Sequence, residues 1–223
     1  MNNFIPDFNF INIDNAAKNL ICCPDQFVAE IKNMKLSNRI YETISYYYDE
    51  KGVPKYSSEY KSDNKIIAVV LESPHIDEYQ YINGVVVPKG PLIGSWKLFK
   101  ENFAGLLYKE FQNLDKSQDY VICFINAIQY QCSLGKPLTG KNSYSLEKNR
   151  NVINAWYSGF NNDLVYRLKA TNPDIIINLS GISMKISKLI DAMLKKDFPN
   201  VLKAYGTHPS RWNKNATRKI KQL

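Results

Sequence analysis

The sequence predicts an α/β protein built as a three-layer αβα arrangement around a central four-stranded parallel sheet. Four short runs are apolar almost throughout, as strands are when helices cover both faces of a parallel sheet. Segments with apolar residues at helical spacing separate these runs along the chain. With 223 residues, the chain fits one large domain that can bury a sizeable core.

The first 64 residues are expected to form an N-terminal helical segment that packs on the same domain. Apolar residues at helical spacing predict a helix over residues 24–48, and a polar link follows it. The stripe consists of Leu36, Ile40, Ile44 and Tyr47.

Residues 65–223 are expected to form the α/β core with a basic C-terminal tail. A loop of about twenty residues, rich in glycine and proline, follows the first strand. The predicted strands cover residues 66–71, 120–125, 173–179 and 201–205, and the predicted helices cover 96–111, 152–168 and 183–196.

The net charge and the cysteine spacing limit which binding partners and which metal sites are expected. The net charge of +8 and the pI near 9.1 favour a polyanionic partner such as nucleic acid. The four cysteines lack the spacing of a zinc site, so we expect thiols, no metal and no cofactor. With neither a secretory leader nor a membrane-spanning run, the sequence predicts a cytoplasmic protein.

Polar residues follow each predicted strand, and parallel strands deliver these residues to one edge of the sheet. The only two histidines lie there in mirrored contexts, Ser-Pro-His and His-Pro-Ser. The expected cluster is Glu72, Ser73, His75, Asp77 and Glu78 after the first strand, Asn126 and Gln129 after the second, Asn178, Ser180 and Gly181 after the third, and Thr207, His208 and Ser210 after the fourth.

Such a set suits cleavage of a bond between a sugar and a base. A carboxylate can stabilise a cation-like sugar or orient water, and a hydrogen-bond donor can stabilise the departing anion. A carboxamide such as that of Asn126 can read a base edge that presents an acceptor beside a donor.

The order of these motifs resembles the uracil-DNA glycosylase superfamily over roughly residues 65–215. The motifs are Leu71-Glu72-Ser73-Pro74-His75, the Gly-Pro-Leu-Ile-Gly segment at 90–94, Asn126 after its strand, Leu179-Ser180-Gly181, and His208-Pro209-Ser210. The resemblance implies a monofunctional glycosylase that flips a pyrimidine nucleotide, hydrolyses its N-glycosidic bond and leaves an abasic site.

The resemblance also implies individual roles. His208 would donate a hydrogen bond to the pyrimidine O2 as the base leaves, Asn126 would read the base edge, and Ser210 would contact a DNA phosphate. Trp212 stands where relatives carry a residue that wedges into the space left by the flipped base, although it could instead pack on the core.

Departures from the family pattern concern the water-activating group and the base pocket. Ser73 occupies the position of an aspartate, so Glu72, then Asp77, then Glu78 are the candidates for that role. His75 and Leu92 replace residues that shape a uracil pocket, so the base could be a modified pyrimidine, such as a hypermodified phage cytosine. That substrate would make the protein an anti-phage defence enzyme rather than a repair enzyme.

DNA, single- or double-stranded, is the expected partner of a monomeric protein. If helical, the basic tail would place Arg211, Lys214, Arg218 and Lys221 on one face toward phosphates. Two alternatives stay open: a DNA-binding module that has lost the chemistry, which Ser73 suggests, and a hydrolase of free nucleosides or nucleotides.

Overall fold

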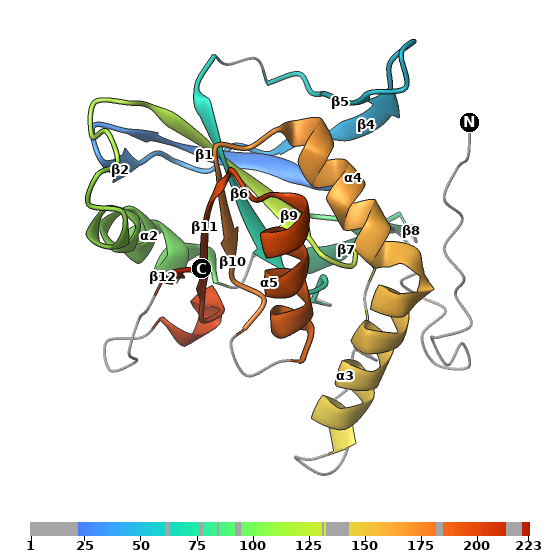
Figure 1. The fold of residues 1–223 in the computed structure, drawn as a ribbon. Helices are drawn as coiled ribbons and strands as arrows, with labels where there is room; N and C mark the ends of the chain where they lie inside the picture. Colours follow the sequence, from blue (N-terminus) through green and yellow to red (C-terminus); the bar gives the residue numbers. More distant parts are fainter. Residues whose placement is uncertain are drawn as a thin grey trace.

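The computed structural model describes residues 22–60, 63–75, 78–83, 85–91, 95–130, 132, 143–181, 185–212 and 220–223. It shows a mixed α/β fold around one curled sheet with the strand order β12-β11-β10-β6-β9-β1-β2 (Figure 1). The sheet strands are β1 (Gln26–Lys32), β2 (Lys35–Leu36), β3 (Glu42–Thr43), β6 (Lys65–Leu71), β9 (Tyr120–Asn126), β10 (Ile175–Asn178), β11 (Leu202–Gly206) and β12 (Ile220–Gln222).

The four predicted strands are confirmed as β6, β9, β10 and β11, and neighbouring members pair in parallel. The sheet is nevertheless larger than the predicted four strands. Antiparallel β1 extends it beyond β9, and antiparallel β12 extends it beyond β11. Because Lys221 belongs to β12, the helix face expected to carry Lys221 with Arg211 is wrong, while Lys214 and Arg218 lie outside the described residues.

The predicted N-terminal helix over residues 24–48 is also wrong, because this stretch forms β1 to β3 and β4 (Ser45–Tyr48). Asn33 and Met34 both have positive φ and link β1 to β2 as a two-residue hairpin turn. β1 then pairs with β9, which buries apolar side chains on both of its faces. Pairing with a distant strand therefore outweighed the local helical spacing. β4 pairs with β5 (Pro54–Ser57) in a separate hairpin.

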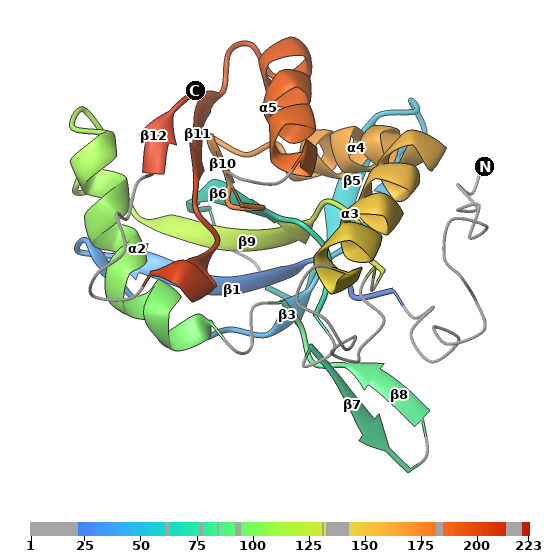
Figure 2. The ribbon, with the colours of Figure 1, turned by 90° about the horizontal axis from the view of Figure 1, so that it is seen from below.

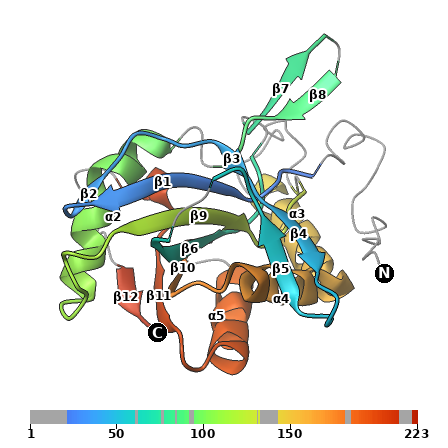
Figure 3. The same ribbon diagram turned by 90° about the horizontal axis from the view of Figure 1, so that it is seen from above.

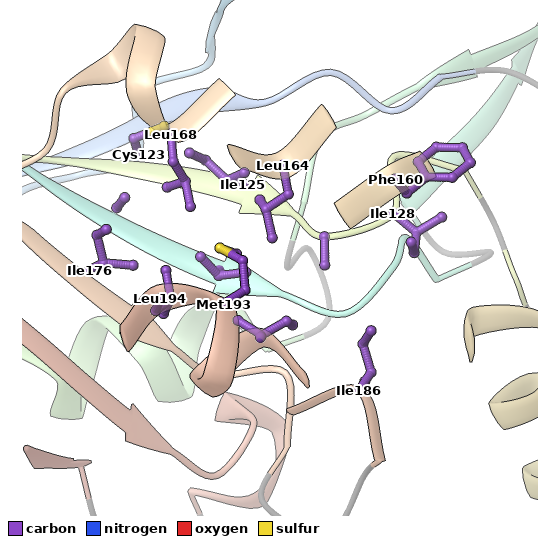
Figure 4. Packing of buried hydrophobic residues seen from close by; sticks show 14 of the residues in the cluster. Cys123, Ile125, Ile128, Phe160, Leu164, Leu168, Ile176, Ile186, Met193 and Leu194 are labelled. Carbon is purple, nitrogen blue, oxygen red and sulfur yellow. The ribbon is translucent and has the colours of Figure 1, made fainter. Parts of the chain in front are cut away.

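Helices cover both faces of the sheet, as Figures 2 and 3 show from opposite directions. The helix α2 (Trp96–Glu110) packs on one face, which we call the α2 face. On the other face lie α3 (Ser143–Ala155), η3 (Trp156–Phe160), α4 (Asn161–Thr171) and α5 (Lys185–Asp197). Figure 4 shows this second core, in which Leu164, Leu168 and Leu194 pack against strand residues such as Ile125.

The loop after β6 carries a hairpin that the sequence did not predict. β7 (Tyr79–Ile82) and β8 (Val85–Pro88) pair in antiparallel fashion and project from the sheet (Figure 2). The last loop includes the short helix η4 (Pro209–Arg211), which follows β11. Both loops leave the sheet at the carboxyl ends of parallel strands, where the sequence predicts the site.

Candidate functional site

The register of the sheet aligns the ends of the parallel strands. Leu71 pairs with Asn126, and Asn178 lies level with Val70 and Tyr205. The chain passes from β6 to β9 on one side of β6 and places β10 on the other side. Sheets of this kind bind ligands in the crevice beside such a reversal of strand order. The segments that follow β6, β9, β10 and β11 therefore leave the sheet at the same edge.

Asn126, the last residue of β9, is 1% exposed, and neither Oδ1 nor Nδ2 has a hydrogen-bond partner among the described residues. Side chains alternate along a strand, so Asn126 points to the α2 face, as Phe124 does. Buried carboxamides are normally hydrogen-bonded, because an unsatisfied buried polar group costs about 1–3 kcal/mol. Asn126 is therefore an unusual buried group, with its full donor and acceptor capacity unused by these residues.

Asn178 ends β10, which β6 separates from β9, and its side chain has the hydrogen bonds usual for a buried carboxamide. Its Nδ2 donates to Asp191 Oδ1 at 2.7 Å and to the Ser187 carbonyl at 3.0 Å. Its Oδ1 accepts from the Ser180 hydroxyl at 2.6 Å. Ser180, predicted to bind substrate, therefore already uses its proton inside the protein. Of these two buried strand-end asparagines, only Asn126 lacks partners within the described structure.

A buried ion pair holds the backbone of Asn126. Arg167 Nη1 donates to Asp25 Oδ2 at 2.7 Å, and Arg167 Nη2 donates to the Asn126 carbonyl at 3.0 Å. Asp25 Oδ1 accepts from the Asn126 N–H at 3.2 Å, and Asp25 Oδ2 also accepts from the Tyr46 hydroxyl at 2.8 Å. A second carboxylate, Asp163, accepts from Arg167 Nε at 2.8 Å.

The electrostatics of this network follow from its burial. Desolvation raises the pKa of Asp25, and the charge and hydrogen bonds of Arg167 oppose that shift. Burial alone would lower the pKa of Arg167, but Asp163 and Asp25 outweigh it and hold the pKa above its ordinary value. The guanidinium therefore stays charged and clamps Asn126 from the face opposite to the one its side chain enters.

Sequence reasoning missed Asp25 and Arg167. A signal for Arg167 was present, because it lies on the apolar face of its helix beside Leu164 and Leu168. A charged residue in an apolar stripe usually has a buried partner. Asp25 gave no comparable signal, since its partner lies 142 residues away.

The residues after β6 divide into buried and exposed groups. Glu72 is 5% exposed, and its carbonyl accepts from the Ile128 N–H. Glu78 is also buried, while His75 is exposed. The Ser73 hydroxyl oxygen is buried without a hydrogen-bond partner among the described residues. Glu72 and Glu78 thus remain candidate carboxylates, and Asp77 and Leu92 lie outside the described residues.

His208 begins the loop after β11, and its Nδ1 accepts a hydrogen bond from the Ser210 N–H at 3.2 Å. The Ser210 hydroxyl lies 2.9 Å from the same nitrogen. An N–H can only donate, so this geometry makes Nδ1 the acceptor, which corresponds to the tautomer with the ring N–H at Nε2. Ser210 and Arg211 are both exposed, as a phosphate contact requires.

The DNA-wedge role expected for Trp212 is wrong, because its side chain is 1% exposed. Its ring stacks on Phe99 at a centroid distance of 5.9 Å and on Phe103 at 6.5 Å. Its Nε1 donates to the Thr207 carbonyl at 2.9 Å. The apolar side of α2 gives this ring a buried surface, so Trp212 fastens the His208 loop to α2 instead.

The thiols of Cys22 and Cys23 are weak nucleophiles near neutral pH, because burial keeps them protonated. All four are free thiols, and burial raises the pKa of Cys22 to about 11 and that of Cys23 further. Within the described parts of the chain, no three histidine, cysteine or acidic residues are grouped to hold a metal ion. Among those same parts, no helix has the length and apolar character needed to span a bilayer.

Two surface hollows lie away from the predicted site residues. One, of about 620 Å³, includes Lys65 and Tyr120 at the amino ends of their strands. The other, of about 540 Å³, lies between β2 and α2 and includes Lys35 and Lys100. Searches against family models, curated proteins and solved structures find no match for the chain.

Proposed function

We propose that the protein is a monofunctional DNA glycosylase with a uracil-DNA glycosylase-like fold, acting on a flipped uracil or modified pyrimidine. The observation that carries this proposal is the Asn126 carboxamide, which is buried at a strand end without a hydrogen-bond partner among the described residues. A flipped base edge with one donor and one acceptor would satisfy both of its polar atoms. Each such pairing discriminates between bases by about 1–3 kcal/mol.

The other groups fit the remaining steps of the reaction. His208 would donate from Nε2 to the base oxygen that becomes negative as the glycosidic bond breaks, with its ring held by the Ser210 N–H bond to Nδ1. Glu72, our first choice, would stabilise the cation-like sugar or take a proton from the attacking water. Asp77 and Glu78 are the alternatives for that carboxylate. Water then bonds to C1′, and the base leaves with the electrons of the broken bond.

The charge of the protein supports a DNA substrate. The net charge of +8 favours a polyanion, and Ser210 and Arg211 expose polar groups beside His208. A phosphate bound there would place the flipped nucleotide between the His208 loop and the end of β9. DNA binding is expected to weaken as salt rises, because each neutralised phosphate releases counterions.

The test is base release from DNAs that differ in one base: uracil, hypoxanthine, cytosine and substituted or glucosylated cytosines. Alkali cleaves the abasic product, so strand breaks identify the excised base. We expect His208→Ala, Asn126→Ala and Glu72→Gln to lower release by at least ~10²-fold. Glu110→Gln is the matched control, since Glu110 bonds Gln222 at the amino edge of the sheet.

Three results would count against the proposal. Salt-sensitive DNA binding with no abasic product from any substrate would leave a binding module with this fold. Release of bases from free nucleosides but not from DNA would make the protein a nucleoside hydrolase. Retention of base release in both His208→Ala and Glu72→Gln would remove the assigned roles.

A further inference from the structure

A second buried carboxamide, that of Gln26, lies beside Asn126. Gln26 is the first residue of β1 and is 6% exposed, and its Oε1 has no hydrogen-bond partner among the described residues. β1 runs antiparallel to β9, and Gln26 pairs with Phe124. Asn126 is two residues beyond Phe124, so Gln26 and Asn126 are diagonal neighbours, whose Cα atoms lie about 7–8 Å apart in such sheets.

Both carboxamides belong to the same face of the sheet. Phe27 lies in the core beneath α3 to α5, so the preceding residue, Gln26, points to the α2 face. Phe124, its cross-strand partner, packs on Phe99 of α2 with ring centroids 4.9 Å apart. The register therefore places two amide side chains on the same face, each with an oxygen atom that has no hydrogen-bond partner among the described residues.

Gly90 covers the Gln26 carboxamide. Its φ is +104°, and a Cβ at this position would overlap with the Gln26 side-chain amide. The next residue, Pro91, accepts a hydrogen bond from Arg39 Nη2, which ties this loop to the segment after β2. The Arg39 guanidinium in turn lies over the rings of Tyr41 and Trp96, at 4.7 and 5.1 Å from their centroids. Gln26 is thus held between the end of β9 and the glycine-rich loop.

We propose that Gln26 is a second base-reading residue, which accepts a hydrogen bond from a donor group of the base outside the edge read by Asn126. The implied substrate is a pyrimidine with an additional amino or hydroxyl group, rather than uracil alone. This inference rests on the proposed glycosylase function. It also gives a role to the N-terminal segment, which lies outside the family resemblance.

Gln26→Met tests the inference, since methionine has similar volume but no amide oxygen. The substrates are DNAs that carry uracil, cytosine or 5-hydroxymethylcytosine at one position. We expect Gln26→Met to lower kcat/KM for the preferred donor-bearing base 10- to 100-fold more than for uracil. Gln26→Glu keeps an acceptor oxygen and should restore most of the preference. Gln118→Met, at the amino edge of the sheet, is the matched control and should change neither rate.

A binding measurement separates failure of this inference from failure of the proposed function. The side-chain amide signals of Gln26 and Asn126 are assigned in ¹H–¹⁵N spectra by their absence from the Gln26→Met and Asn126→Leu variants. Both signals are then followed in the wild type during titration with 2′-deoxyuridine and with 5-hydroxymethyl-2′-deoxycytidine. We expect both amides to shift with the second nucleoside and Asn126 alone with the first. If Gln26 responds to neither nucleoside, the inference is wrong even where the protein releases bases. If both amides respond but no DNA substrate yields alkali-sensitive strand breaks, the base-binding pocket is supported and the proposed glycosylase function is wrong.

Discussion

Replacing Arg167 with methionine gives the sharpest test of how the site is built. Arg167 is 2% exposed and makes hydrogen bonds to Asp25, Asp163 and the backbone carbonyls of Asn126 and Ala127. Methionine fills much of the volume but leaves the Asp25 carboxylate buried without its countercharge. Removal of one partner of a buried ion pair typically costs about 3–5 kcal/mol, so we expect a loss of that size near neutral pH.

The loss should depend on pH with a defined sign. Burial already raises the pKa of Asp25, and without Arg167 that pKa rises further. A carboxyl group whose pKa is higher in the folded than in the unfolded state takes up a proton on folding. The variant should therefore be least stable at high pH and recover by up to ~1.4 kcal/mol per pH unit as pH falls toward the unfolded value near 4.

The assay is urea unfolding of the wild type and Arg167→Met at intervals between pH 5 and pH 8. The Asp25→Asn, Arg167→Met double variant removes the buried charge and should show little of this pH dependence. Asp163→Asn is the milder control, because Asp163 bonds Arg167 but not Asn126. A loss in Arg167→Met below about 1 kcal/mol, or one that is constant across this pH range, would refute the buried clamp.

Three further predictions concern single side chains. Asn126→Leu should abolish base release. It should leave the free energy of unfolding unchanged or raise it by about 1–3 kcal/mol, because the side chain has no hydrogen bond to lose among the described residues. A large fall in the urea midpoint would contradict this. Trp212→Ala should lower the free energy of unfolding by about 3–5 kcal/mol, because a buried aromatic ring stacked on Phe99 is lost. An unchanged thermal midpoint would show that Trp212 is not buried in this way. The pKa of about 11 predicts that iodoacetamide alkylates Cys22 slowly at pH 8 until urea is added, which mass spectrometry can follow; rapid labelling of the folded protein would show an activated thiol.

The sequence was sufficient to predict the central strands because each is a nearly continuous apolar run. β9 is buried at every position, and such a run is recognisable without knowledge of its neighbours. The N-terminal segment was mispredicted because its strand character comes from pairing with β9. Polar and apolar residues do not alternate regularly in the segment Gln26-Phe27-Val28-Ala29, and no turn signal bounds it. A bulge between Phe27 and Ala29 further disturbs the two-residue period of a strand.

The candidate site was predictable to a similar degree. Asn126 and His208 follow from topology, since parallel strands all end at one edge. Gln26 and Arg167 could not be placed, because their positions depend on an antiparallel register and on a helix packing across a face of the sheet. Trp212 was open to two interpretations, and only the packing of Phe99 and Phe103 decides between them.

The antiparallel direction of β1 allows the residues of the candidate site to change independently of one another. Each parallel strand has its carboxyl end at the edge of the sheet that carries the candidate site, whereas β1 has its amino end there. The candidate site therefore combines residues from widely separated parts of the gene. Under the proposed function, base preference could then be altered through Gln26 while Asn126 at the end of β9 and His208 in the loop after β11 remain unchanged. If the proposed function holds, exchange of a short N-terminal segment would change the base that is read without changing the residues assigned to bond cleavage.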